Sequence, residues 1–181
     1  RSSGVPFSAM SEPVPLPRTA SVADLHELAR ERLDDNAYDY YRSGAGSEWT
    51  LRENESAFRR WTFAKQVLVD VSSPDLSVDL FGTHLDVPVV VAPTAMHQLA
   101  DPDGEVATAR ATLDRGSLMV VSTLANRPLE DVAATGVPRW FQLYVQKDRG
   151  ATRDLVDRVV AAGYTALALT VDTPELGKIG R

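Results

Sequence analysis

The sequence contains no cysteine among its 181 residues. Disulfides, thiol catalysis and thiolate metal sites are therefore excluded, and we predict no other metal site. The absence of disulfides fits a cytoplasmic protein, which is the location we expect. No apolar run approaches the roughly 20 residues of a membrane-spanning helix, so we expect no membrane association. The net charge of −6 disfavours nucleic acid as a partner.

Two phosphate-binding motifs are also missing. The sequence has neither a G-x-G-x-x-G fingerprint after a strand nor a Walker loop, so a classical nicotinamide site is not predicted, and the "GAG" at 44–46 is too weak to count. What is present is ordinary for a globular protein, with 44% hydrophobic and 24% charged residues. The length suffices for a domain with a sizeable core.

The amino-terminal part divides into a lead-in and a helical segment. We expect residues 1–20 to be a cloning remnant and an extended proline-rich lead-in, with Met10 as the native start. Residues 21–86 are predicted to form helices at 21–35, 36–43 and 48–60 and a hairpin with a Gly-Thr turn at 76–89. Ser21 and Asp24 form a capping-box pair, and the third helix should bury Trp49, Leu51 and Ala57.

Residues 87–181 show a different pattern of apolar residues. Short apolar runs begin near 87, 118, 140 and 166 and are separated by helical segments, which is typical of a parallel sheet covered by helices. A doubly wound sheet and a β/α barrel both fit. In either one, ligands bind at the carboxyl ends of the strands. The informative stretches are therefore "APTAM", "STLAN", "QLYVQKD" and "TVDTP".

Several stretches resemble one enzyme family. "YDYYRSGAGSEWTLRENESAF", "VAPTAM", "DPDGEVATARA", "FQLYVQKDR" and "LTVDTPELG" occur in the order found in FMN-dependent 2-hydroxy-acid oxidases and dehydrogenases, such as those acting on glycolate or lactate. The resemblance covers roughly residues 22 to 178. It implies oxidation of an L-2-hydroxy acid to the 2-oxo acid, with electrons passing to FMN and then to oxygen or another acceptor.

The resemblance implies a TIM barrel of which this chain supplies the amino-terminal helices and about four β/α units. The remaining half of the barrel would be a partner of this part, and would carry the general-base histidine, an arginine beside it, a lysine near the flavin and the phosphate site. His26, His84 and His97 are not expected to be the base. The family also implies a homo-oligomer, a tetramer.

By the same resemblance, six residues would contact FMN. Gln142 would hydrogen-bond the flavin ring, Ser122 and Thr170 would contact it from neighbouring strand ends, and Pro93, Thr94 and Ala95 would line it. Gln142 and Tyr144 share one face of their strand because side chains alternate.

The resemblance also implies substrate-site residues. Tyr40 and Tyr144 would bind the substrate, and Asp172 would hold the catalytic histidine. Tyr38 and Tyr41 are more typical of packing. Leu124 stands where glycolate oxidase has a bulky tryptophan, which leaves the side-chain pocket open. Ile179 replaces the family arginine that binds the substrate carboxylate, so Lys178 or Arg181 is the candidate cation.

Two other readings fit parts of the sequence. A non-catalytic half barrel would bind a partner or self-associate through its open strand edges. Another TIM-barrel enzyme, such as an isomerase or lyase, would share the strand-end arrangement but would leave the tyrosine-rich helix unexplained.

Overall fold

The computed structural model describes residues 21–172. The expected lead-in at 1–20 and the candidate cation Arg181 lie outside these residues. The chain divides into two compact units, Arg1–Tyr41 and Arg42–Arg181, each described by itself. Among the helices of the described part, none combines the length and apolarity that a membrane crossing requires.

The first unit is built on two helices, α1 (Val22–Arg32) and α2 (Asp35–Arg42). The last residue of α2, Arg42, belongs to the second unit. The predicted capping box is confirmed, since Asp24 N donates to Ser21 Oγ at 3.3 Å and Ser21 N donates to Asp24 Oδ2 at 2.9 Å. Tyr38 ties the helices together, because its hydroxyl lies 2.7 Å from His26 Nε2.

The second unit begins with α3 (Trp49–Ser56), the 3₁₀ turn η1 (Ala57–Arg60) and a hairpin of β1 (Val78–Leu80) and β2 (Thr83–Leu85). The hairpin turn is Phe81–Gly82 rather than Gly-Thr. The expected burial of α3 is wrong for two side chains, because Trp49 is 65% and Leu51 39% exposed.

Four parallel strands form the main sheet, in the order β3 (Val90–Val91), β4 (Leu118–Val121), β5 (Arg139–Leu143) and β6 (Leu167–Leu169). Each strand lies beside the one that follows it in sequence, as in a β/α barrel, whereas a doubly wound sheet reverses its strand order at a switch point. β3 is shorter than the predicted run because it pairs with only one neighbour in the described sheet.

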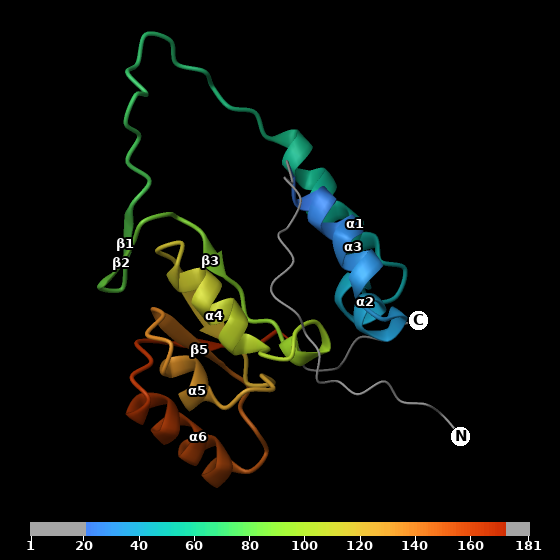
Figure 1. Cartoon of the computed structure of the whole chain (residues 1–181), viewed down its shortest axis with the longest axis vertical. Helices are drawn as coiled ribbons and strands as arrows, with labels where there is room; N and C mark the ends of the chain where they lie inside the picture. The colour runs from blue at the N-terminus through green and yellow to red at the C-terminus, as the bar shows by residue number, and fades with distance from the viewer. Residues whose placement is uncertain (1–20, 173–181) are drawn as a thin grey trace. The chain divides into compact units, whose positions relative to one another are not determined.

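Three helices cover one face of this sheet: α4 (Glu105–Leu113), α5 (Leu129–Ala133) and α6 (Arg149–Ala161). Figure 1 shows them in a row on one side of the strands. The strands bury alternate residues against them, namely Met119, Val121, Phe141 and Leu143. We call this the outer face.

The opposite face, called the inner face, has a smaller core. Leu118 and Val120 pack there with Leu85 of the hairpin, and Trp140 and Ala168 lie against them. Phe81 in the hairpin turn meets Trp140 edge to face, with ring centroids 5.4 Å apart. The hairpin therefore covers part of the inner face, and the carboxyl ends of the strands lie beyond it.

Candidate active site

The candidate site is built from inner-face residues at the carboxyl ends of β4, β5 and β6. Side chains alternate along β5, so Trp140, Gln142 and Tyr144 point to the inner face while Phe141 and Leu143 point to the helices. Gln142 is the centre of the site and is only 4% exposed. A buried amide requires hydrogen-bond partners, and its partners define the site.

Gln142 joins three strand ends. Its Oε1 accepts from Ser122 Oγ at 3.4 Å and from Thr123 N at 3.1 Å. Its Nε2 donates to Thr170 Oγ1 at 2.8 Å. The structure therefore brings together Ser122, Gln142 and Thr170, three of the residues predicted from the sequence.

Thr123 is a part of this arrangement that the sequence analysis missed. Its hydroxyl donates to the carbonyl oxygen of Gln142 at 2.5 Å and accepts from Tyr144 N at 3.1 Å. It thus fixes the backbone on both sides of Leu143. The available signal was a second hydroxyl directly after Ser122 at a strand end, where side-chain hydroxyls commonly bond to backbone.

The loop after β3 carries the predicted residues Pro93, Thr94 and Ala95. Pro93 and Thr94 are exposed and Ala95 is half-buried. Met96, with φ of 59°, then turns the chain, and its N–H donates to the carbonyl oxygen of Leu124 at 3.4 Å. This contact joins the loop to the one that carries Leu124, whose side chain is 52% exposed.

The residues predicted to touch substrate are the more exposed ones. Tyr144 is 36% exposed, and Asp172, the last described residue, is exposed as well. Tyr40 belongs to the first unit, is 40% exposed, and its hydroxyl makes no hydrogen bond within residues 21–172, although its ring packs edge to face on Tyr41. Tyr38, by contrast, is held by His26. The substrate roles remain predictions.

Each histidine has a side-chain partner outside the candidate site. His97 Nδ1 lies 2.9 Å from Thr108 Oγ1 of α4, on the helix side of the sheet. His84 lies in β2, with Nδ1 3.0 Å from Asp79 Oδ1. That none of the three is the base stays a prediction.

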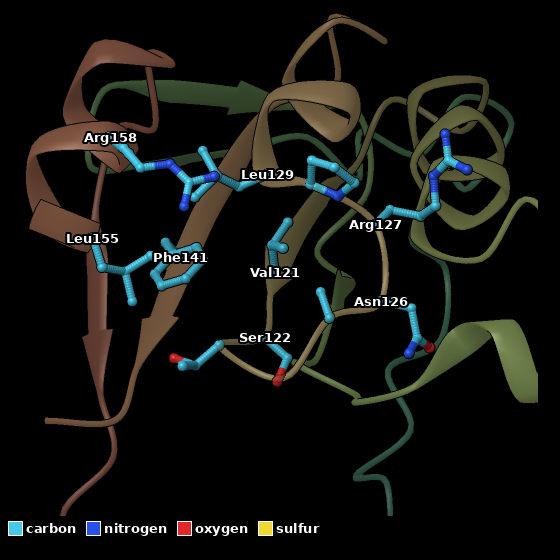
Figure 2. A pocket seen from close by; sticks show the side chains of 11 residues that line it. Val121, Ser122, Asn126, Arg127, Leu129, Phe141, Leu155 and Arg158 are labelled. Atoms are coloured by element: carbon cyan, nitrogen blue, oxygen red, sulfur yellow. The ribbon is translucent and has the colours of Figure 1, made fainter. Parts of the chain in front are cut away.

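A pocket of about 280 Å³ lies close by, but on the outer face, as Figure 2 shows. Val121 and Phe141 form part of it, and these side chains point towards the helices. Its two arginines are already paired. Arg158 donates to both carboxylate oxygens of Glu130 at 2.9 and 3.0 Å, and Arg127 donates to Asp131 at 2.9 Å. The pocket therefore has no excess positive charge for an anion, and it shares Ser122 and Thr123 with the candidate site.

The inner-face site suits a planar ligand with hydrogen-bonding groups along its edge. The second Nε2 hydrogen of Gln142 has no acceptor among residues 21–172, and the Thr170 hydroxyl that accepts from Nε2 can itself donate. The edge of a flavin ring carries both acceptors and a donor. The residues present therefore fit FMN, with Gln142, Thr170 and Ser122 as the groups that would hold its ring.

The fold and the site define a β/α-barrel flavoprotein. Residues 29–181 match the family described as FMN-dependent dehydrogenase, and the chain belongs to this family, whose cofactor is FMN. The chain is similar to glycolate oxidase 3 of Arabidopsis thaliana and glycolate oxidase 1 of Zea mays. Each is 48% identical over 159 residues, covering 87% of this chain and 43% of the relative. The chain thus spans less than half the length of these relatives.

Solved structures agree. Mandelate oxidase bound to (S)-4-hydroxymandelic acid is 37% identical with a TM-score of 0.86, covering 89% of this chain and 45% of that one. A mandelate oxidase variant solved with an FMN adduct is 36% identical with a TM-score of 0.83, over 86% of this chain and 47% of that one. The predicted fold, the amino-terminal part of a TIM barrel, is confirmed.

Proposed function

We propose that this chain is the amino-terminal part of an enzyme that oxidises an L-2-hydroxy acid to the 2-oxo acid. The observation that carries the proposal is the hydrogen-bonded line Ser122–Gln142–Thr170 at the carboxyl ends of three neighbouring strands, in a member of an FMN-dependent family. The relatives are glycolate and mandelate oxidases, which supports a small 2-hydroxy acid as substrate.

In the proposed reaction, the alcohol loses two protons, one from the hydroxyl and one from the carbon that bears it, together with two electrons, and a carbonyl forms. When bound, FMN supplies the two-electron acceptor, which oxygen or another acceptor then reoxidises. Tyr40 and Tyr144 would donate hydrogen bonds to the substrate oxygens and so fix its orientation. Asp172 would hold the base histidine, which we place in the other half of the barrel, and would stabilise that histidine when it takes up the proton.

Leu124 bears on the choice of substrate. Its side chain is 52% exposed beside the loop that carries Pro93, Thr94 and Ala95. If it lines the substrate pocket as proposed, a flexible leucine there would admit a larger side chain than glycolate has. Glycolate, lactate and mandelate therefore form a graded panel for testing the substrate.

The open edge of the sheet supports the carboxyl-terminal half of the barrel as partner. Leu167 and Leu169 of β6 are 46% and 55% exposed, and Val171 just beyond is 81% exposed. These residues lie in register with Phe141 and Leu143 on the outer face, so their exposure favours cover by a further helix, while the open edge of β6 favours pairing with a further strand. We also propose a homo-oligomer located in the cytoplasm, which sedimentation of the complete protein and cell fractionation would test.

The test uses the complete protein, prepared without oxygen. We expect flavin absorbance to bleach when an L-2-hydroxy acid from the panel is added, and the D enantiomer of lactate to be the control for stereochemistry. If oxygen then restores the absorbance with release of hydrogen peroxide, the enzyme is an oxidase. Recovery only with an added electron acceptor marks a dehydrogenase. Protein that binds FMN but is bleached by no member of the panel contradicts the proposed function.

A further inference from the structure

Glu105, the first residue of α4, has a buried carboxylate that the proposed chemistry does not use. Its side chain is 0% exposed, and it accepts three backbone hydrogen bonds. Oε1 accepts from His97 N at 3.2 Å and from Asn126 N at 3.1 Å, and Oε2 accepts from Arg127 N at 3.0 Å. Charged side chains are rarely buried completely, so this carboxylate needs an explanation.

The three donors come from two different loops. His97 lies in the loop after β3, and Asn126 and Arg127 lie in the loop after β4. A further hydrogen bond joins the same loops, since Gln98 N donates to Asn126 Oδ1 at 3.1 Å. The Glu105 carboxylate therefore connects the two loops through their backbone N–H groups. These loops carry five of the predicted site residues: Pro93, Thr94, Ala95, Ser122 and Leu124.

The charge of Glu105 is held by backbone dipoles. Burial raises the pKa of its carboxyl, but the backbone N–H groups of Arg127, Asn126 and His97 outweigh burial and hold the pKa below its usual range. No salt bridge to Glu105 occurs within the described residues. The amino terminus of α4 also favours a negative charge at this position.

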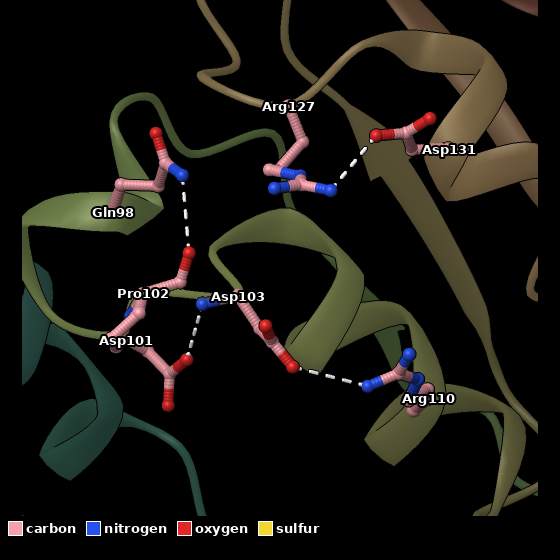
Figure 3. A network of polar contacts seen from close by, with 7 residues as sticks. All are labelled: Gln98, Asp101, Pro102, Asp103, Arg110, Arg127 and Asp131. Atoms are coloured by element: carbon pink, nitrogen blue, oxygen red, sulfur yellow. Dashed lines mark hydrogen bonds and ion pairs between the residues drawn. The ribbon is translucent and has the colours of Figure 1, made fainter. Parts of the chain in front are cut away.

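The residue just before Glu105 is a glycine in a backbone conformation that other residues rarely adopt. Gly104 has φ of +55°, and a Cβ there would come within 2.8 Å of Gln98 Cγ. Figure 3 shows polar contacts of the neighbouring residues: Arg110 donates to Asp103 at 3.1 Å, and Gln98 Nε2 donates to the carbonyl oxygen of Pro102 at 3.1 Å. These polar contacts are exposed, whereas Glu105 is buried.

We propose that Glu105 is a positioning residue for the flavin: its carboxylate holds the loops after β3 and β4 in one arrangement and so sets the surface that the ring contacts. This inference rests on the proposed function. Glu105 itself lies beneath the loops, on the helix that packs against the outer face, and acts only through the backbone it binds.

The test compares Glu105→Gln with Glu130→Gln in the complete protein. Both remove a carboxylate from the first turn of a helix, but Glu130 pairs with Arg158 and touches neither loop. The glutamine at 105 keeps one acceptor oxygen and turns an NH₂ group towards backbone donors, which leaves at least one buried N–H unpaired. We expect the FMN dissociation constant to rise roughly tenfold for Glu105→Gln and to stay unchanged for Glu130→Gln.

Two further readouts separate positioning from general stability. Well below the unfolding transition, amide exchange at His97, Asn126 and Arg127 should accelerate in Glu105→Gln, and the visible circular dichroism and the reduction potential of the bound flavin should shift. A variant that is less stable but binds FMN with unchanged affinity, spectrum and potential overturns the inference. If the parent protein itself binds no FMN, it is the proposed function that fails.

A second variant covers the case in which Glu105→Gln does not fold. Asn126→Ala removes the acceptor of Gln98 N while leaving the buried carboxylate in place. We expect a smaller loss of FMN affinity in the same direction, roughly twofold to fivefold, because one of the ties between the loops is gone. FMN binding identical to that of the parent protein would overturn the inference.

Discussion

The two faces of the parallel sheet differ in what they bury. On the outer face, Met119, Val121 and Phe141 pack against three helices of the same chain. On the inner face, the apolar packing ends at Trp140, whose buried indole N–H has no acceptor in the described part of the chain, and gives way to the amide of Gln142. Over β4 and β5 the outer face is covered by helices of the same chain, and this packing holds the fold. The inner face presents polar groups that require something further, which is where a ligand belongs.

The largest expected loss of stability comes from removing a buried side chain of the outer face. Phe141 is 2% exposed and packs edge to face on Tyr164, with centroids 5.8 Å apart. We expect Phe141→Ala to lower the free energy of unfolding by about 3–5 kcal/mol, because a large cavity opens in the core. Urea unfolding of the complete protein measures the change.

The control for this prediction is Arg153→Ala, on the exposed side of α6. It should change the stability by less than about 0.5 kcal/mol. If Phe141→Ala cost as little as Arg153→Ala, the outer face would not be the part that holds the fold.

Replacing Gln142 tests the inner face. Gln142→Ala removes the acceptor of Thr123 N and the donor to Thr170. We expect FMN affinity to fall about tenfold to a hundredfold, while stability falls by only about 1–2 kcal/mol. Fluorescence titration with FMN and urea unfolding give the two numbers. A loss of stability as large as that of Phe141→Ala, with FMN binding retained, would make Gln142 a structural residue.

Much of this contrast was predictable from the sequence. Continuous apolar runs indicated strands buried on both faces, and the alternation of side chains placed Gln142 and Tyr144 on one face. The strand order was not predictable from the apolar runs alone, because a barrel and a doubly wound sheet share the same alternation of strands and helices. The family resemblance predicted the barrel, and the structure shows its strand order.

Other features could not be read from the sequence for physical reasons. Glu105 looks like an ordinary acidic residue in the first turn of a helix, and only the fold brings the N–H groups of two distant loops to its carboxylate. Trp49 looked like a core residue because of its size and helical spacing. Its burial depends on which surfaces lie against the helix, and local sequence does not specify these.

Tyr40→Phe tests a proposed substrate contact and leaves the proposed flavin contacts unchanged. We expect kcat/KM to fall roughly tenfold through a higher KM and a lower kcat, with FMN still bound, because one hydrogen bond to the substrate is lost. Steady-state kinetics and flavin content are the measurements. The matched control is Tyr38→Phe, which loses the bond to His26 and should reduce stability by about 1 kcal/mol without changing the kinetics. Loss of flavin in Tyr40→Phe would instead assign Tyr40 to packing.

The smallest expected effect concerns a phenol of the outer face. The Tyr164 hydroxyl donates to the carbonyl oxygen of Leu129 at 2.8 Å, and burial raises the pKa of Tyr164 to about 12, although the nearby Arg139 partly opposes the shift. The unfolded chain ionises this phenol near pH 10. The folded state therefore gains stability that is fully present below about pH 10 and is lost as the pH rises towards 12.

Tyr164→Phe should cost about 1 kcal/mol at neutral pH through the lost hydrogen bond and should flatten the decline of stability between pH 10 and 12. Urea unfolding at a series of alkaline pH values is the measurement. Tyr144→Phe is the comparison on the inner face, because the Tyr144 side chain is 36% exposed and its replacement removes no buried phenol. Equal flattening by both variants would show that burial of a phenol does not distinguish the two faces.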